Sequence, residues 1–233
     1  MVKRDTLGEA GATALISVFN KDGIEVFGKE LLNTGYKLLS SGGTAKFLKA
    51  EGLPVKDVVR FVGKRFLELG ERVGIPEEKI IDLAKFFGGA ILDHKVATLN
   101  PDIYAGLLAS YGLEDDEMMS LAFSHIDLVC CDLYPLEAEI ARDGSTIESV
   151  REQTDIGGPS MIRAGAKGRR IVVCDAADRS RVIRWIRDGY RNREAVITAL
   201  AAKAENVAAS YCQASADYLS AQVPNLEELL GAA

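Results

Sequence analysis

The 233-residue sequence is poor in histidine and cysteine, and it contains no long apolar run. Its two histidines and four cysteines do not form a zinc-type ligand pattern, so we predict no zinc site. Catalytic-triad spacing and the Rossmann and P-loop signatures are also missing. No segment reaches transmembrane length and the first residues lack an apolar signal core, so we expect a cytoplasmic protein with no membrane partner.

Basic residues are outnumbered by acidic ones. The sequence has 28 basic and 34 acidic residues, a formal net charge of −6. Without a basic stripe it does not suit the coating of a nucleic acid, whereas a small phosphorylated ligand needs only a local pocket. With 48% hydrophobic residues the chain can build a core of useful size, and we predict a single domain over residues 1–233.

The four cysteines are predicted to be reduced thiols, which fits a cytosolic compartment. Cys130 and Cys131 are adjacent in the apolar run IDLVCCDL, and neighbouring residues on a strand point to opposite faces. A bond between these two is therefore not expected. Cys174 lies in a similar run, RRIVVCD, and Cys212 follows in a helical segment.

Apolar runs alternate with helical periodicity in the first sixty residues. Predicted strands cover residues 14–19, 36–41, 53–59, 126–135 and 169–175. Predicted helices cover residues 23–35, 42–52, 178–190 and 193–222. Strand–helix–strand units of this length predict an α/β fold with a parallel sheet and right-handed crossovers.

Two segments fall outside this alternation. Residues 63–90 are charged and helix-prone, with Pro76 dividing them into two predicted helices, and a connection rich in turn signals follows. Residues 223–233 form a predicted tail whose leucines dock either on the body or on a partner.

The segment TDIGGPSMIRAGAK, residues 154–167, combines a carboxylate, a Gly-Gly turn and two cations. A helix opening at Gly158 or Pro159 places Arg163 and Lys167 on one face, and Asp155 in the turn beside free backbone N–H groups. Such an arrangement suits proton transfer on a phosphorylated substrate. The same pattern is equally typical of a well-capped surface helix with solvated charges.

Ligands of open parallel sheets bind beyond the carboxyl ends of the strands. There, Ser41-Gly42-Gly43-Thr44 opens a helix, and glycines, hydroxyls and the helix dipole together favour a phosphate. A plain turn with a helix cap has the same pattern. Residues 20–23 and 132–135 also follow strands.

The remaining polar candidates each have a structural alternative. Tyr134, at a strand end before a proline, is typical of a half-buried packing residue, and Lys21 of a solvated side chain. His125 suits a structural role. His94, between Asp93 and Lys95, is the better candidate for a functional ionisable group.

Taken in order, six motifs resemble the IMP cyclohydrolase domain of the bifunctional AICAR transformylase/IMP cyclohydrolase of purine synthesis. They are ISVFNKDGI, LLSSGGTAKFL, KVATLNP, DLVCCDLYP, TDIGGPSMIRAGAK and RRIVVCD. The resemblance implies a methylglyoxal-synthase-like three-layer α/β fold with a mainly parallel central sheet and extra C-terminal helices. It also implies a homodimer acting on a purine ribotide without cofactor. Since no transformylase segment is present in the sequence, that activity would belong to a separate partner.

The implied reaction closes the ring of formyl-AICAR ribotide to inosinate with loss of water. The resemblance assigns proton transfer to Asp155, Lys167 and Tyr134. It assigns substrate binding to Ser17, Lys21, Ser41, Gly42, Gly43, Thr44, Lys95, Thr98, Asp132, Ile156 and Gly157. The phosphate is implied at Ser17, Lys21 and residues 41–44, and the backbone N–H groups near Ile156 and Gly157 would steady charge on the reacting oxygen.

The sequence departs from the family at several of these positions. The active-site lysine is replaced by Ala97, an arginine by Lys95 and a histidine by Asn100. Phe19 replaces a serine, Asp132 an asparagine, and Asp93 and His94 two glycines, directly behind the 63–90 insertion. Lys95, His94, Asp93 or a basic residue of the insertion are candidate replacements. The alternatives are a ribotide-binding regulatory module, or an enzyme repurposed for another reaction on a similar ribotide.

Overall fold

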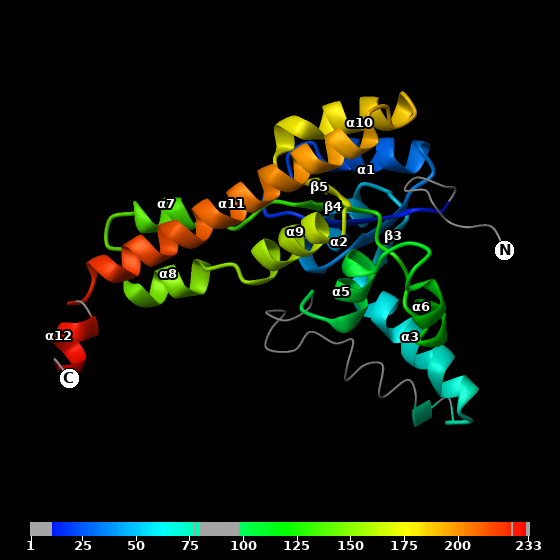
Figure 1. Ribbon diagram of the computed structural model, residues 1–233, viewed down its shortest axis with the longest axis horizontal. Coiled ribbons are helices and arrows are strands. Elements are labelled where there is room, and N and C mark those ends of the chain that lie inside the picture. Colours follow the sequence, from blue (N-terminus) through cyan, green and yellow to red (C-terminus); the bar gives the residue numbers. More distant parts are fainter. Residues whose placement is uncertain (1–10, 77, 80–97, 225, 232–233) are drawn as a thin grey trace.

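The computed structural model describes residues 11–231 except 77, 80–97 and 225 (Figure 1). Its centre is a five-stranded sheet in the order β3-β2-β1-β4-β5, and every strand pair is parallel. The strands are β1 (Thr13–Ser17), β2 (Lys37–Ser40), β3 (Val55–Asp57), β4 (Leu128–Cys131) and β5 (Ile171–Val173). The predicted α/β class is confirmed, and the sheet that was expected to be mainly parallel is wholly parallel among the described residues.

Helices cover both faces of the sheet and make three layers (Figure 1). One face carries α1 (Ile24–Asn33), α2 (Gly42–Ala50) and α10 (Arg179–Arg187). The other carries α3 (Val58–Arg72), α5 (Pro101–Leu108) and α9 (Gly157–Lys167). The long helix α11 (Arg193–Ala221) packs on α9 and β5.

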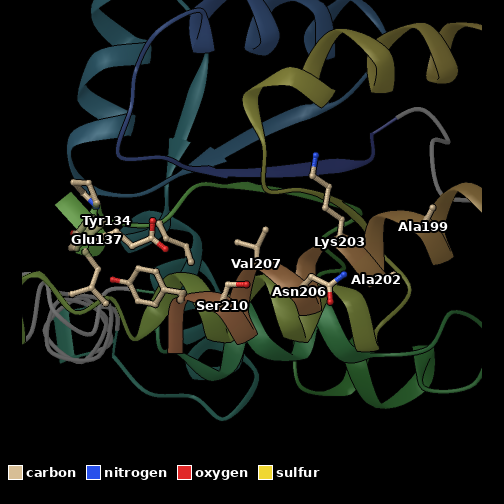
Figure 2. Close-up of a pocket in the computed structure, with 12 residues that line it drawn as sticks. Tyr134, Glu137, Ala199, Ala202, Lys203, Asn206, Val207 and Ser210 are labelled. Carbon is tan, nitrogen blue, oxygen red and sulfur yellow. The ribbon is translucent and has the colours of Figure 1, made fainter. Parts of the chain in front are cut away.

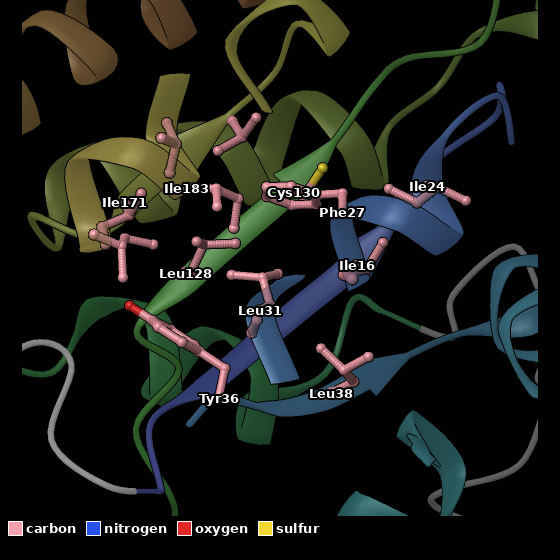
Figure 3. Packing of buried hydrophobic residues seen from close by; sticks show 14 of the residues in the cluster. Ile16, Ile24, Phe27, Leu31, Tyr36, Leu38, Leu128, Cys130, Ile171 and Ile183 are labelled. Atoms are coloured by element: carbon pink, nitrogen blue, oxygen red, sulfur yellow. The ribbon is translucent and has the colours of Figure 1, made fainter. Parts of the chain in front are cut away.

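Alternation along each strand divides the core between the two faces. Ile16 packs toward α1 with Phe27 and Leu31, as Figure 3 shows, whereas its neighbour Leu15 belongs to the core on the α9 side. The adjacent thiols of Cys130 and Cys131 are separated in the same way, which confirms the prediction that they do not pair.

Beyond the sheet, α11 is covered by two short helices, α7 (Leu136–Ile140) and α8 (Ile147–Gln153). Leu136 of α7, Val150 of α8 and Tyr211 of α11 form a small separate core. Two further short helices are α6 (Asp115–Ser120) and α12 (Leu226–Leu230), and η1 (Ala176–Asp178) is a 3-10 turn. None of the helices in the described ranges is both long and apolar enough to span a membrane.

Several predicted boundaries were wrong. The third strand ends at Asp57 instead of Val59, because Val58 and Val62 are both buried one helical turn apart and belong to α3. The turn signals at Asn100 and Pro101 begin α5: the Asn100 side chain accepts a hydrogen bond of 2.9 Å from the Asp102 N–H, and proline suits the first helical position.

The two segments outside the strand–helix alternation are residues 63–90 and the tail 223–233. The first predicted helix of 63–90 is the C-terminal part of α3, which ends at Arg72, ahead of Pro76. Most of the second predicted helix lies outside the described residues. In the tail, Leu229 and Leu230 of α12 are exposed, so these leucines do not dock on the body of the chain.

A buried polar network ties α5 to β5 at the amino end of the strands. Arg170 is 1% exposed; its Nε donates to Leu107 O at 2.9 Å, its Nη2 donates to Ala109 O, and its guanidinium lies 4.4 Å from the centre of the Tyr111 ring. The Tyr111 hydroxyl donates to Asp127, whose other carboxylate oxygen accepts the Thr13 N–H at 2.7 Å. The network therefore satisfies carbonyls that α5 leaves unpaired at its end.

His125 completes this network, and its protonation is expected to lower the stability of the protein in acid. Its Nδ1 lies 3.3 Å from Nη2 of Arg170, its Nε2 lies 3.0 Å from Asp115, and its ring stacks on Tyr111. Burial lowers the pKa of His125, and the neighbouring Arg170 lowers it further. The unfolded chain therefore binds the proton first, so the free energy of unfolding should fall as the pH drops from about 6.5 through the lowered value.

Urea unfolding of the wild type and His125→Gln at several pH values between 7.5 and 5 measures this effect. The wild type should lose more stability than the variant, with the extra slope staying below about 1.4 kcal/mol per pH unit, the limit for one proton. Equal slopes for the two proteins would contradict the prediction.

Candidate functional site

The candidate site lies at the carboxyl ends of β1 and β4. Strand β1 is paired with β2 on one side and β4 on the other. The chain continues from β1 to β2 toward one edge of the sheet and from β4 to β5 toward the opposite edge. Such a switch point is where open α/β sheets bind their ligands. The loop after β1, the start of α2 and the segment after β4 meet there.

An anion cradle is formed where α2 begins, from Ser17, Ser41, Gly42, Gly43 and Thr44. Ser17 Oγ and Ser41 Oγ lie 3.4 Å apart, which joins the end of β1 to the helix cap. Thr44 is buried, and its hydroxyl accepts the Val18 N–H at 3.2 Å and donates to Val18 O at 3.0 Å. Gly42 has φ +51°, a conformation that favours glycine. The Ser41 side chain does not cap the helix, so the first turn presents its N–H groups to a ligand.

Lys21 and Asp132 lie beside this cradle. The Lys21 ammonium donates to the carbonyls of Val18 and, at 2.9 Å, Phe19 within its own loop. Burial lowers its pKa and the charge of Asp132 raises it. Asp132 directs its carboxylate to the backbone of Phe19 and Asn20, which draws the chain out of β4 and explains why that strand ends at Cys131 and not at Pro135 as predicted.

Asp155 is the candidate proton-transfer group with the most defined environment. Its Oδ1 accepts the Gly158 N–H at 2.8 Å, and the backbone N–H groups of Gly157 and Tyr134 are also directed at its carboxylate. Burial nevertheless raises its pKa above the ordinary value, with the charge of Asp132 adding to the rise. A Cβ on Gly158 would collide with this carboxylate, so the second glycine of the DIGG motif makes room for Asp155.

The hydrogen bonds around Asp155 affect one expected role. The Gly157 N–H, expected to steady the reacting oxygen, is directed at the Asp155 carboxylate. Ile156 is exposed beside it. Thr98 Oγ1 lies 3.0 Å from the position that a Cβ on Gly157 would occupy, so Thr98 packs on the start of α9.

An aromatic pair completes this edge of the sheet. The exposed rings of Phe19 and Tyr134 meet edge to face with their centroids 5.7 Å apart. Partial burial raises the pKa of Tyr134, and the charge of Asp155 raises it further, so the hydroxyl is kept protonated at neutral pH. Tyr134 is therefore suited to donate a proton or a hydrogen bond next to Asp155.

Lys167 is not brought to Asp155 within this chain. It is the last residue of α9 and is exposed, about 15 Å along the helix axis from Gly157. Arg163 is exposed too, and its Nε contacts Glu205 of α11 at 2.9 Å. The two cations share the outer face of α9, as predicted, but this face turns away from the cradle because the opposite face packs in the core. Lys95, His94, Asp93 and Ala97 lie outside the described residues.

Sequence reasoning missed two residues of the site. The Tyr211 hydroxyl of α11 accepts the Asp155 N–H at 2.7 Å and donates to Gln153 O at 3.1 Å, which fixes the turn before α9. Arg179, the first residue of α10, is buried and lies beside Asp132. Both are far from their partners in sequence, and no local pattern marks either one.

An open groove of about 760 Å³ adjoins the site between residues 133–137 and α11 (Figure 2). Tyr134 and Tyr211 line it, together with Val207. Lys203, at the same wall, pairs with Asp175 and Asp178 at 2.6 Å each. Among the residues that the structure describes, no cluster of three metal-ligating side chains occurs.

Comparison with known proteins gives consistent matches. The bifunctional purine biosynthesis protein PurH of Caldicellulosiruptor saccharolyticus is 38% identical over 182 residues, 75% of this chain and 30% of that protein. PurH of Magnetococcus marinus is 38% identical over 216 residues, 89% of this chain and 36% of that protein. The chain thus spans about a third of the length of these relatives.

The structure and the family model agree with these relatives. A solved structure described as the crystal structure of ForH aligns with a TM-score of 0.71 at 25% identity, over 92% of this chain and 100% of that one. The model of the MGS-like domain matches residues 23–160, which include α2, β4 and the turn at Asp155. With this match over more than half of its length, the chain belongs to the family of MGS-like domains.

Proposed function

We propose that this protein is an IMP cyclohydrolase of purine biosynthesis, which closes the ring of formyl-AICAR ribotide to give inosinate and water. The observation that carries the proposal is the half-buried Asp155 carboxylate, held beside Tyr134 at the same sheet edge as the anion cradle. The names of the PurH relatives support a role in purine biosynthesis.

In this reaction the carboxamide nitrogen attacks the formyl carbon, and the formyl oxygen leaves as water. One proton from the carboxamide nitrogen and one from the formylated amine end on that oxygen. Asp155 is the base at the carboxamide nitrogen, because its raised pKa makes it a better proton acceptor than an ordinary carboxylate. Tyr134, kept protonated by its surroundings, donates to the departing oxygen.

Orientation supplies much of the rate in an intramolecular cyclisation. The N–H groups at the start of α2 and the hydroxyls of Ser17 and Ser41 suit the ribotide phosphate. The rings of Phe19 and Tyr134 offer an aromatic edge against which a flat heterocycle packs favourably. The phosphate and the base would thus be held at two points with the reacting groups near Asp155.

A ribotide-binding regulatory module is the second candidate. It is favoured by the Gly157 N–H, because this donor is directed at Asp155 and does not serve a developing oxyanion. Such a module would use the same cradle without turning over its ligand.

The two candidates separate in one assay. Purified protein is mixed with formyl-AICAR ribotide while the absorbance of inosinate is followed, and binding of the unformylated ribotide is measured by calorimetry. Inosinate formation well above the uncatalysed rate is expected. Binding without turnover would overturn the enzyme proposal in favour of the module, and the absence of both would overturn the two together.

A further inference from the structure

Asp132 and Arg179 form an ion pair behind the anion cradle, and it joins three separate parts of the chain. Asp132 follows β4, Arg179 begins α10, and the loop after β1 lies between them. Arg179 Nη2 lies 3.8 Å from Asp132 Oδ2, and Arg179 Nη1 donates to Asp22 O at 2.8 Å. The guanidinium therefore holds the loop that carries Lys21 from one side while Asp132 holds it from the other.

The Asp132 carboxylate occupies backbone donors next to the cradle. It accepts the Phe19 N–H, and the Asn20 N–H at 3.3 Å. Its side chain is 24% exposed, and burial raises its pKa, against the lowering effect of these two N–H groups and of Arg179 and Lys21. An anionic side chain is thus kept close to a site suited to an anionic ligand.

Arg179 is built into the protein more deeply than a surface cation. Its side chain is 9% exposed, and its charge acts on the buried Cys130 thiol. Among the described residues its buried Nε has no hydrogen-bond partner. A buried guanidinium with one unused donor is costly unless its charge is needed where it stands.

We propose that Arg179 is the positioning residue of the phosphate-binding end of this site, neutralising Asp132 and fixing the loop that carries Lys21. Without Arg179, the Asp132 carboxylate would repel the phosphate that the cradle binds. This inference rests on the proposed ribotide site, and it assigns Asp132 a structural partner in place of a direct role as acid or base.

Removal of the Asp132 charge tests the proposed neutralisation, and it has to be judged against the groups that interact with Asp132. They are Arg179 of α10, Lys21 of the loop after β1, Cys130 and Cys131 of β4, and Asp155 before α9. Asp132→Asn in the Arg179→Met background takes away the carboxylate charge and, with it, the repulsion.

The experiment measures ribose 5-phosphate binding by calorimetry at pH 8, where the phosphate is a dianion, and compares each variant with the wild type. Arg179→Met should weaken binding about tenfold, the effect of roughly 1.4 kcal/mol of uncompensated repulsion. The double variant Arg179→Met/Asp132→Asn should recover most of this loss, and the remainder reports the missing bond from Arg179 to Asp22 O. Arg181→Met, an exposed arginine of the same helix, is the matched control and should bind like the wild type.

Loss of binding that Asp132→Asn does not reduce would overturn the inference. If Arg179→Met does not fold, Arg179→Lys serves instead. Because lysine keeps the charge, Arg179→Lys should lose clearly less than tenfold in affinity, and a loss of about tenfold or more would count against the inference. Failure of the wild type to bind ribose 5-phosphate would instead overturn the proposed function.

Discussion

Asp155→Asn is expected to lower the rate of ring closure by about 10²–10⁴-fold, the usual contribution of one positioned base. Asparagine keeps the size of the side chain and an oxygen for the Gly158 N–H, but it does not accept a proton. The variant should therefore fold and bind the ribotide while losing turnover. Stopped-flow absorbance at saturating substrate measures the effect, and calorimetry measures binding.

The pH profile of the wild type gives an independent test of the same group. Because burial raises the pKa of Asp155, the acid limb of kcat/KM should lie at a higher pH than an ordinary aspartate would give. Activity should fall as the pH drops through this raised value. The matched control is Asp143→Asn in the exposed connection between α7 and α8, which should retain full activity. An Asp155→Asn enzyme within tenfold of the wild type would remove Asp155 from the mechanism.

Arg170→Met is expected to cause the largest loss of stability, about 3–5 kcal/mol. Methionine fills part of the volume but leaves the carbonyls of Leu107 and Ala109 without their donor and Asp127 without a nearby cation. For a chain of this size the melting temperature should fall by roughly 6–20 °C. Calorimetry or circular dichroism measures this change.

Arg163→Met is the matched control for this substitution. Arg163 is an exposed arginine of α9 whose ion pair with Glu205 is also exposed. Exposed pairs of this kind contribute no more than about 1 kcal/mol, so its melting temperature should change little. If the two variants had the same melting temperature, the network around Arg170 would not be the stabilising element that its burial indicates.

The positions of the strands and of the cradle could be predicted because they follow local patterns. Apolar alternation located β1 and β2, and Ser41-Gly42-Gly43-Thr44 was predicted to open a helix beyond a strand and does so. Cys130 and Cys131 lie on opposite faces of the sheet simply because successive side chains of a strand alternate between the two faces. These features require only neighbouring residues, and the sequence carries them directly.

The pairings within the site could not be predicted in the same way. The bond between Asp155 and Tyr211 spans 56 residues, and the contact between Asp132 and Arg179 joins β4 to α10. Lys167 shows the opposite case: a short motif suggested that it acts with Asp155, yet the rise of the intervening helix separates them. The predicted helix already implied this separation, because it placed Lys167 more than two turns beyond its first residue.

The central place of β1 in the sheet affects how the protein is made on the ribosome. β1 gains its first neighbour once α1 and β2 (Lys37–Ser40) have been synthesised, but its other edge stays open until β4 emerges more than 100 residues after β1. An open strand edge of a nascent chain is prone to unwanted pairing. The turn that carries Asp155 is completed later still, because its hydrogen-bond partner Tyr211 lies near the end of the chain. Release of a truncated product before Tyr211 would therefore yield a sheet without a finished site.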